Sequence, residues 1–330
     1  MKGWYIYDSN IHDWNKLLND TKQNLIYNQE FWINLKIQEG WNASQLCYKI
    51  DNGEVKMVLV IFTKSYLSFK YIWSPGGLSN CNLDVFEDSL TQLKSFLDNN
   101  FGIFYFRMNS VDLFSPYRNY YFNKYFKKPK VLISSGFTII NDTTLGLDQI
   151  LNNLNSKRRY YLKSALKQNL VWGIGLSKEI IDDLKLVFNN FSKEREIRFK
   201  IPANSEIDYL SNFINDFVFI VGYKDGAAVT AAIVNITDEV PLYLYAATTS
   251  EGRKISASYS MICQLHDFLC KSGYKHFDLL GISPFEDDIA GIDKFKLTFS
   301  GQISKYNGEW EHGTLINRFL GNLIIKLKNL

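Results

Sequence analysis

The chain has 330 residues, which exceeds the usual size of one hydrophobic core and predicts two domains. Hydrophobic residues make up 46% and charged residues 22%, a composition that excludes disordered and fibrous proteins. The mild net charge of +3 does not favour a surface dedicated to duplex nucleic acid, but it allows a local basic patch for a phosphate-bearing substrate. With no signal-peptide pattern and no apolar run of about eighteen residues, we expect a cytoplasmic protein.

In the first half, one turn signal organises the strand patterns. Asn52 and Gly53 separate the apolar runs 45–50 and 56–63, which predicts a β-hairpin. A helix with apolar spacing follows at 84–99, and a buried strand at 102–108. Further helices are expected at 13–18 and 29–39, and a further strand at 66–73.

The second half repeats this order. Asp225 and Gly226 separate the expected strands 217–224 and 227–237. A long helix at 256–272 ends before Gly273, a typical C-terminal cap. Helices are also expected at 147–167, 178–195 and 208–214, and strands at 241–247 and 276–280. The repetition suggests two related units.

The C-terminal segment 315–330 has the pattern of an amphipathic helix with Arg318, Lys326 and Lys328 as its cations. Two interpretations are open, a packing helix and a helix on a membrane surface, and the pattern favours the first. The four histidines and four cysteines are scattered without metal-ligand spacing, so we expect no metal and no cofactor.

The segment 275–301 is the most informative part of the chain. An expected strand ends at Gly281, a loop with proline and acidic residues follows, and Phe295 and Lys296 come after Gly291. A lysine beside an aromatic after such a loop can hold its charge against an oxyanion or a phosphate. A solvated amphipathic turn is the alternative, and the residues alone favour it.

Several motifs resemble those of the Fem family, the non-ribosomal aminoacyltransferases related to GNAT acetyltransferases. The segment 276–301 resembles the C-terminal signature of that family, and the other motifs occur in the same order along the chain. They are QEFW with Lys36 and GW at 29–41, WSPGG at 73–77, FYFRMN at 104–109, GF at 136–137, LNSKRRYYLKSALK at 154–167, and YLY with EGRK at 243–254.

The resemblance implies an α/β (α+β) fold of two GNAT-like acyltransferase domains, each a mixed twisted sheet flanked by helices. The expected domains are 1–146 with 304–330 on the acceptor side, and 147–303 on the donor side. The last helix would return to the first domain. The segment 193–209 is too short for the coiled-coil arm of some members, so the armless form is expected.

On the donor side, the resemblance implies that Lys296 stabilises the transition-state oxyanion or the terminal phosphate of the donor. Phe295 would stack on the donor's terminal base, or belong to the core. Arg253 and Lys254 stand where GNAT proteins hold a pyrophosphate, but serines 256 and 258 replace the glycines of that loop. This departure argues against coenzyme A and is compatible with a tRNA-borne donor, although Ser256 could simply cap the helix.

On the acceptor side, Lys36, four residues after Trp32, would grip a diphosphate together with Arg195 or Arg198, and each of these cations could instead be solvated.

Family members acting on peptidoglycan often carry an aspartate, proposed as the base, where this chain has Asn109. An amide accepts no proton at neutral pH. Water, the substrate, Asp112, Tyr243 or Tyr245 could take this role, or the acceptor could differ.

The resemblance therefore predicts a transfer of an aminoacyl group from aminoacyl-tRNA to an amine of a cell-envelope precursor, such as one of peptidoglycan. The acceptor would be nucleotide- or lipid-linked, with a possible peripheral membrane contact. The alternative is a GNAT-fold N-acyltransferase with a thioester donor, acting on an amino sugar in surface-polysaccharide synthesis. A third possibility is a non-catalytic pair of domains that only binds its ligand.

Overall fold

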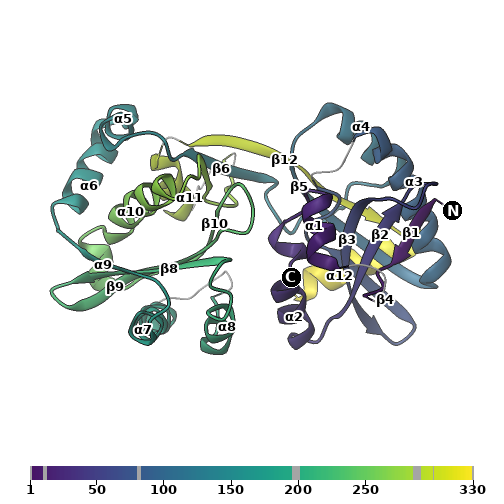
Figure 1. The fold of residues 1–330 in the computed structure, drawn as a ribbon, viewed down its shortest axis with the longest axis horizontal. Coiled ribbons are helices and arrows are strands. Elements are labelled where there is room, and N and C mark those ends of the chain that lie inside the picture. Colours follow the sequence, from purple (N-terminus) through teal and green to yellow (C-terminus); the bar gives the residue numbers. More distant parts are fainter. Residues whose placement is uncertain are drawn as a thin grey trace. The chain divides into compact units, whose positions relative to one another are not determined.

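The computed structural model describes residues 2–9, 13–79, 83–194, 201–284, 291–299 and 301–328. The chain divides into two compact units. Unit 1 consists of Met1–Phe137 with Ser304–Leu330, and unit 2 of Thr138–Ile303. Figure 1 shows the yellow C-terminal elements of unit 1 beside its purple and blue ones. The chain first passes from unit 1 to unit 2 between residues 137 and 138, earlier than the boundary expected at residue 146.

Unit 1 is built on a sheet with the strand order β1-β2-β3-β4-β5-β12. Neighbouring strands are antiparallel except β4 and β5, which run parallel from Phe69 opposite Ile103 to Ser74 opposite Met108. The strands are β1 (Gly3–Ile6), β2 (Asn42–Lys49), β3 (Val55–Tyr66), β4 (Phe69–Ser74), β5 (Ile103–Leu113) and β12 (Gln302–His312).

The helices of unit 1 begin at side-chain caps where the sequence supplies them. The Asp13 carboxylate accepts the backbone N–H of Lys16 at 3.0 Å, so the first helix begins at Trp14. The helices are α1 (Trp14–Asp20), η1 (Ile26–Asn28), α2 (Glu30–Gln38), α3 (Leu83–Asn100), α4 (Pro116–Tyr125) and α12 (Leu315–Lys328).

The core of unit 1 forms where α3 packs on the sheet. Phe86, Leu90, Leu93 and Leu97 recur at helical spacing and are fully buried, together with the apolar side chains of β3. Burying each such side chain contributes roughly 1.5–3 kcal/mol. This core fixes the β3-β4-β5 part of the sheet, which carries the polar groups described below.

Unit 2 has its own sheet, with the strand order β6-β11-β10-β9-β8-β7. The strands β10 and β11 are parallel, and the other neighbours are antiparallel. The strands are β6 (Phe137–Asp142), β7 (Val171–Ile174), β8 (Phe217–Lys224), β9 (Ala227–Asn235), β10 (Leu242–Thr248) and β11 (His276–Asp278).

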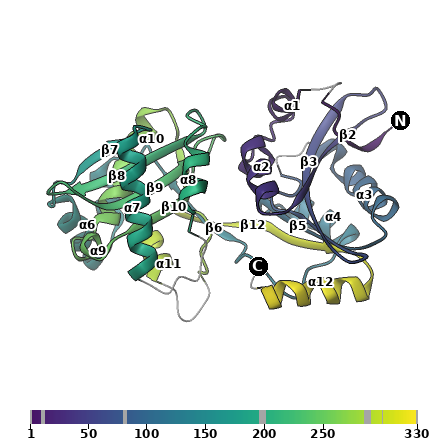
Figure 2. The ribbon, with the colours of Figure 1, turned by 90° about the horizontal axis from the view of Figure 1, so that it is seen from below.

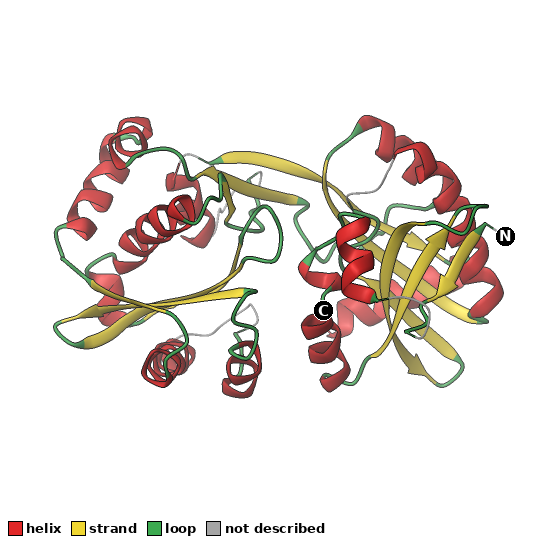
Figure 3. Cartoon of the chain, in the orientation of Figure 1, coloured by secondary structure: helices red, strands yellow, loops and turns green. Residues whose placement is uncertain are grey.

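Helices cover both faces of this second sheet. Figures 2 and 3 show α7 and α8 on one face and α6 and α10 on the other. The helices are α5 (Leu147–Asn153), α6 (Ser156–Leu166), α7 (Lys178–Glu194), α8 (Asn204–Leu210), α9 (Ser250–Lys254), α10 (Ala257–Lys271), α11 (Gly291–Lys296) and η2 (Leu297–Phe299).

The predicted fold class is confirmed, since each unit is a mixed sheet flanked by helices. Both predicted hairpins form, with Asn52-Gly53 and Asp225-Gly226 in the turns. The helix expected at 208–214 is wrong in its bounds. It spans Asn204–Leu210 instead, and the backbone after Ser211 bends in successive turns toward β8. Strands β6 and β7 and helix α4 were not predicted, because short or aromatic-rich segments show little periodicity.

Candidate functional site

Lys296 is buried at the end of α11 in unit 2, with 8% of its surface exposed. Its ammonium donates to the carbonyl oxygens of Gly281 at 2.9 Å and Leu280 at 3.3 Å. Leu280 has a φ of 61°, which is unusual for a residue other than glycine. An ammonium has three N–H donors, so among the described residues one of them is left without a protein partner.

Burial lowers the pKa of Lys296 from its usual value to about 8, and the carboxylates of Asp293 and Asp278 oppose this shift. Such a group is still largely protonated at neutral pH. Among the residues that the structure describes, its charge faces two neutral carbonyls and no carboxylate at hydrogen-bond distance. Lys296 can therefore offer a positive charge to an anion in a partly desolvated setting.

The two acidic groups near Lys296 were not among the predicted site residues. Asp293 is buried and accepts the backbone N–H of Ser283 at 2.9 Å. Asp278, at the end of β11, accepts the N–H of Leu280 at 2.6 Å and the hydroxyl of Thr138. The two carboxylates therefore bind the loop whose Leu280 and Gly281 carbonyl oxygens accept hydrogen bonds from Lys296. In the sequence, Asp293 stands three residues before Lys296, a spacing that places both side chains on one face of a helix.

Phe295 belongs to an aromatic cluster with Tyr259 of α10 and Phe299. Its ring centroid lies 5.1 Å from that of Tyr259 and 5.3 Å from that of Phe299, both in edge-to-face geometry. The side chain is half-buried. The cluster fixes the end of α11 and thereby Lys296, while stacking of Phe295 on a donor base stays a prediction.

The structure separates Tyr243 and Tyr245, which the sequence grouped together. A β-bulge pairs Tyr243 with Val234 and Tyr245 with Ile233, so the two side chains lie on opposite faces of the sheet. Tyr243 packs edge-on against Phe277, and burial raises the pKa of its hydroxyl. Tyr245 donates to the buried Glu206 of α8 at 2.8 Å. The two tyrosines therefore cannot serve one reacting group together.

Arg253 and Lys254 are engaged by carboxylates in the structure. Arg253 donates to Glu194 at 2.8 Å and to the Thr248 carbonyl at 2.6 Å, and Lys254 pairs with Glu251 at 2.6 Å. Ser256 precedes α10 with a φ of 56°, and its hydroxyl makes no capping bond. Ser256 is therefore the N-cap residue of α10, as one interpretation of the sequence expected, but it caps the helix without a side-chain hydrogen bond. The two cations could still serve a phosphate if it displaced these exposed carboxylates.

Lys36 in unit 1 lies over the ring of Trp32, with 4.8 Å from its ammonium to the ring centroid, as their four-residue spacing requires. Only 7% of its surface is exposed, and it pairs with Glu39 at 2.8 Å. It is therefore no solvated cation, and the alternative considered from the sequence is wrong for this residue. Arg195 and Arg198 lie outside the described residues.

Asn109 lies near the end of β5, where the turn after β4 approaches it. Its amide oxygen is buried without a hydrogen-bond partner among the described residues. Gly77 has a φ of 55°, and an added Cβ would lie 2.9 Å from the carbonyl oxygen of Asn109. Only glycine fits this approach. The carboxyl ends of the parallel strands β4 and β5 therefore meet beside an unsatisfied acceptor.

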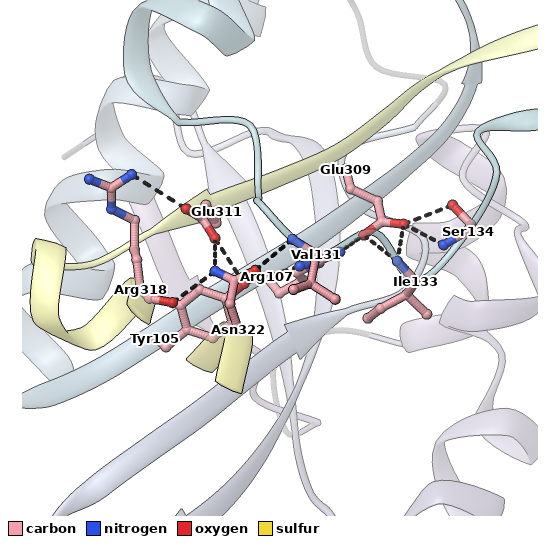
Figure 4. A network of polar contacts seen from close by, with 9 residues as sticks. All are labelled: Tyr105, Arg107, Val131, Ile133, Ser134, Glu309, Glu311, Arg318 and Asn322. Carbon is pink, nitrogen blue, oxygen red and sulfur yellow. Dashed lines mark hydrogen bonds and ion pairs between the residues drawn. The ribbon is translucent and has the colours of Figure 1, made fainter. Parts of the chain in front are cut away.

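A buried network of ion pairs and hydrogen bonds joins β5 to β12 (Figure 4). The sequence did not predict this network. Arg107 is fully buried, pairs with Glu309 of β12 and donates to Tyr105 at 3.2 Å. Glu309 also accepts the backbone N–H groups of Ile133 and Ser134. Removal of one of these side chains would leave the others buried without a hydrogen-bond partner. The network therefore fixes the register of β5 and β12.

A cavity of about 440 Å³ lies elsewhere in unit 2. It is lined by nine residues of α5, α6, α10, β7 and the segment leading into β7, and none of them is a predicted site residue: Leu147, Leu166, Asn169, Leu170, Trp172, Ser260, Cys263, Gln264 and Asp267. Among the described residues, no group of three or more His, Cys, Asp or Glu side chains could hold a metal ion.

The two units define a tandem GNAT-like fold. FemX shares it over 97% of this chain and 99% of its own, at 14% identity and a TM-score of 0.73. The match to the C-terminal domain of a putative lysylphosphatidylglycerol synthetase from Agrobacterium fabrum covers 95% of this chain and 96% of that one, at 14% identity and a TM-score of 0.60. The match to a tandem GNAT protein from the clavulanic acid biosynthesis pathway covers 95% of this chain and 98% of that one, at 7% identity and a TM-score of 0.53.

Residues 204–314 match the model of the FemAB family, and the predicted resemblance to the Fem family is thereby confirmed. This match includes Tyr243, Tyr245, Arg253, Lys254 and Lys296. No curated protein matches the sequence.

Proposed function

We propose that this protein transfers an aminoacyl group from aminoacyl-tRNA to an amine of a cell-envelope precursor. The amine would attack the ester carbonyl of the donor, forming an amide bond as the bond to the ribose oxygen breaks. The proton lost by the amine would end on that ribose oxygen. The single observation that carries the proposal is Lys296, buried inside the segment that matches the FemAB family and held by two neutral carbonyls.

In this reaction Lys296 would stabilise negative charge. A positive group in a partly desolvated site stabilises an oxyanion more strongly than one in water. Two of its donors are used by fixed carbonyls, which orient the third. Phe295 and Tyr259 would hold α11 in place, and Phe295 would offer its exposed side to the terminal base of the donor.

The choice of tRNA over coenzyme A rests on the segment before α10. The serines at 256 and 258 replace the glycines that let a backbone approach a pyrophosphate. Arg253 and Lys254 are also paired with Glu194 and Glu251. We therefore expect no micromolar binding of acetyl-coenzyme A in calorimetry. Tight binding with acyl transfer from the thioester would instead support the amino-sugar N-acyltransferase.

The acceptor would bind in unit 1, with Lys36 near its diphosphate and Asn109 near its amine. The buried, unpartnered amide oxygen of Asn109 can accept a hydrogen bond from an ammonium or amine, although it cannot take up the proton. Asn109 would then position the amine while water or the leaving ribose oxygen receives the proton.

Mass spectrometry of products from a matrix of donors and acceptors tests the proposal. The donors are aminoacyl-tRNAs and acyl thioesters; the acceptors are nucleotide- and lipid-linked peptidoglycan precursors, phosphatidylglycerol and an amino sugar. A product heavier by one aminoacyl residue, made only from tRNA and an amine-bearing precursor, is expected. Products from thioesters alone would overturn the assignment of the donor. Ligand binding without any product would favour a non-catalytic protein.

A further inference from the structure

Helix α12 packs on unit 1 through a side that is mostly polar, although Ile325 is buried there as well. Asn322 donates to Glu311 at 2.7 Å, and Arg318 pairs with the same carboxylate at 3.3 Å (Figure 4). Gly321 lies against the ring of Tyr105, where an added Cβ would come within 2.2 Å of ring atoms. The inner side of the helix therefore contacts the buried ionic network of β5 and β12.

The apolar side of α12 consequently points outward, the reverse of an ordinary packing helix. Six apolar side chains at helical spacing are exposed, several of them by two thirds or more: Leu315, Ile316, Phe319, Leu320, Leu323 and Leu327. Exposed apolar groups in such a continuous stripe mark a contact surface. The packing helix favoured from the sequence exists, but it packs with the opposite face.

A basic loop with two exposed apolar residues adjoins this helix. The backbone N–H of Val131 donates to Asn322 of α12 at 3.0 Å, which joins the loop to the helix. Lys127 and Lys130 are exposed, and so are Leu132 and Ile133.

The surface carries only positive charge. Lys326 adds an exposed cation at the edge of the stripe on α12. Neither the loop 127–135 nor α12 contains an aspartate or a glutamate.

We propose that α12 and the loop 127–133 form a docking surface for the anionic face of a lipid bilayer. The helix would lie in the plane of the interface with its apolar side among the acyl chains, and the lysines would meet acidic headgroups. A second copy of this chain is a poorer occupant. A two-fold contact through this surface would bring the lysines of one copy against those of the other with no carboxylate between them.

Co-sedimentation of the full chain with vesicles tests this proposal. Vesicles of phosphatidylcholine with phosphatidylglycerol should bind the protein about tenfold or more tightly than phosphatidylcholine alone, because each lysine near an anionic surface adds attraction. The double change Phe319→Glu and Leu323→Glu should reduce binding at least tenfold. Both side chains are exposed, so the melting temperature should not change. Lys127→Ala with Lys130→Ala should weaken binding only to the anionic vesicles.

The matched control is Leu186→Glu on α7 of unit 2, where the leucine is 50% exposed on a helix outside the proposed surface. Unchanged binding is expected for this variant. Failure of the wild-type chain to bind either vesicle would overturn the proposal, as would equal binding of the α12 variant. If light scattering instead shows a dimer that the α12 change dissociates, the surface joins two copies. No aminoacyl donor is present in this experiment, so no transfer takes place and vesicle binding is measured separately from the proposed reaction.

Discussion

Two buried cations of unit 1, Lys36 and Arg107, are bound differently from Lys296 of unit 2. In unit 1, Lys36 pairs with Glu39 and Arg107 pairs with Glu309, so carboxylates neutralise both charges inside the protein. In unit 2, Lys296 is held by the carbonyls of Leu280 and Gly281, and burial lowers its pKa to about 8. Among the described residues, Lys296 has no carboxylate at hydrogen-bond distance, and the proposed charge stabilisation in unit 2 rests on this difference.

The largest effect should come from breaking an internal pair in unit 1. Arg107→Met leaves Glu309 buried without its cation, and removing one partner of such a pair typically costs about 3–5 kcal/mol. Denaturant unfolding measures the loss. The control is Lys124→Met, which removes a cation from an exposed pair with Glu87 and should change stability far less, because solvent screens such a pair. Equal effects of the two changes would contradict the structural role of the Arg107 pair.

Next, His266 should make unit 2 sensitive to acid. Burial lowers the pKa of this histidine from 6.5 to about 4, so the unfolded chain binds the proton more readily than the folded one. The resulting stability is complete above pH 6.5 and is lost as the pH falls toward 4, by about 3 kcal/mol.

Unfolding of the wild type and of His266→Gln over this pH range isolates the contribution of His266. The variant should lose less stability toward acid than the wild type. The exposed His276→Gln should behave like the wild type. Parallel pH profiles for the wild type and His266→Gln would refute the assignment.

Lys296→Ala should reduce turnover of the folded enzyme by about a hundredfold or more, because the substitution removes a charge that acts on the transition state. Steady-state kinetics with saturating substrates measures this effect. Lys294, two residues earlier on α11 and exposed, supplies the control Lys294→Ala, which should remain nearly as active as the wild type. Near-normal turnover of Lys296→Ala would exclude its catalytic role.

The smallest expected effect is that of Lys36→Met, which should raise the KM of the acceptor more than it lowers kcat. Loss of one charge-assisted contact costs about 2 kcal/mol. Glu39→Gln removes the carboxylate that pairs with Lys36. This change should leave the KM of the acceptor unchanged or lower it. A rise in the KM of the donor instead would place Lys36 on the donor side and reverse the assignment of the two substrates.

Local patterns predicted much of the fold, because hairpin turns and helical spacing depend on neighbouring residues. The contact of Lys36 with Trp32 followed from their separation alone. The pairing of Arg107 with Glu309 did not, since 202 residues separate them and only the register of β5 and β12 brings them together.

Three features of the sites depend on geometry that the sequence does not encode locally. The carbonyls that hold Lys296 depend on Leu280, which adopts a left-handed φ without a glycine to signal it. The bulge that separates Tyr243 from Tyr245 interrupts an otherwise regular strand pattern. The amphipathic pattern of α12 predicted a helix, but the buried ionic network determines which side packs.

The pH dependence of kcat tests most directly whether the charge of Lys296 drives the reaction. With a pKa of about 8, the ammonium loses its proton as the pH rises through that value, so kcat should fall above about pH 8. In Lys296→Arg, any remaining activity should persist to higher pH, because a guanidinium keeps its charge. A wild-type kcat that stays constant or rises up to pH 10 would contradict the role of Lys296.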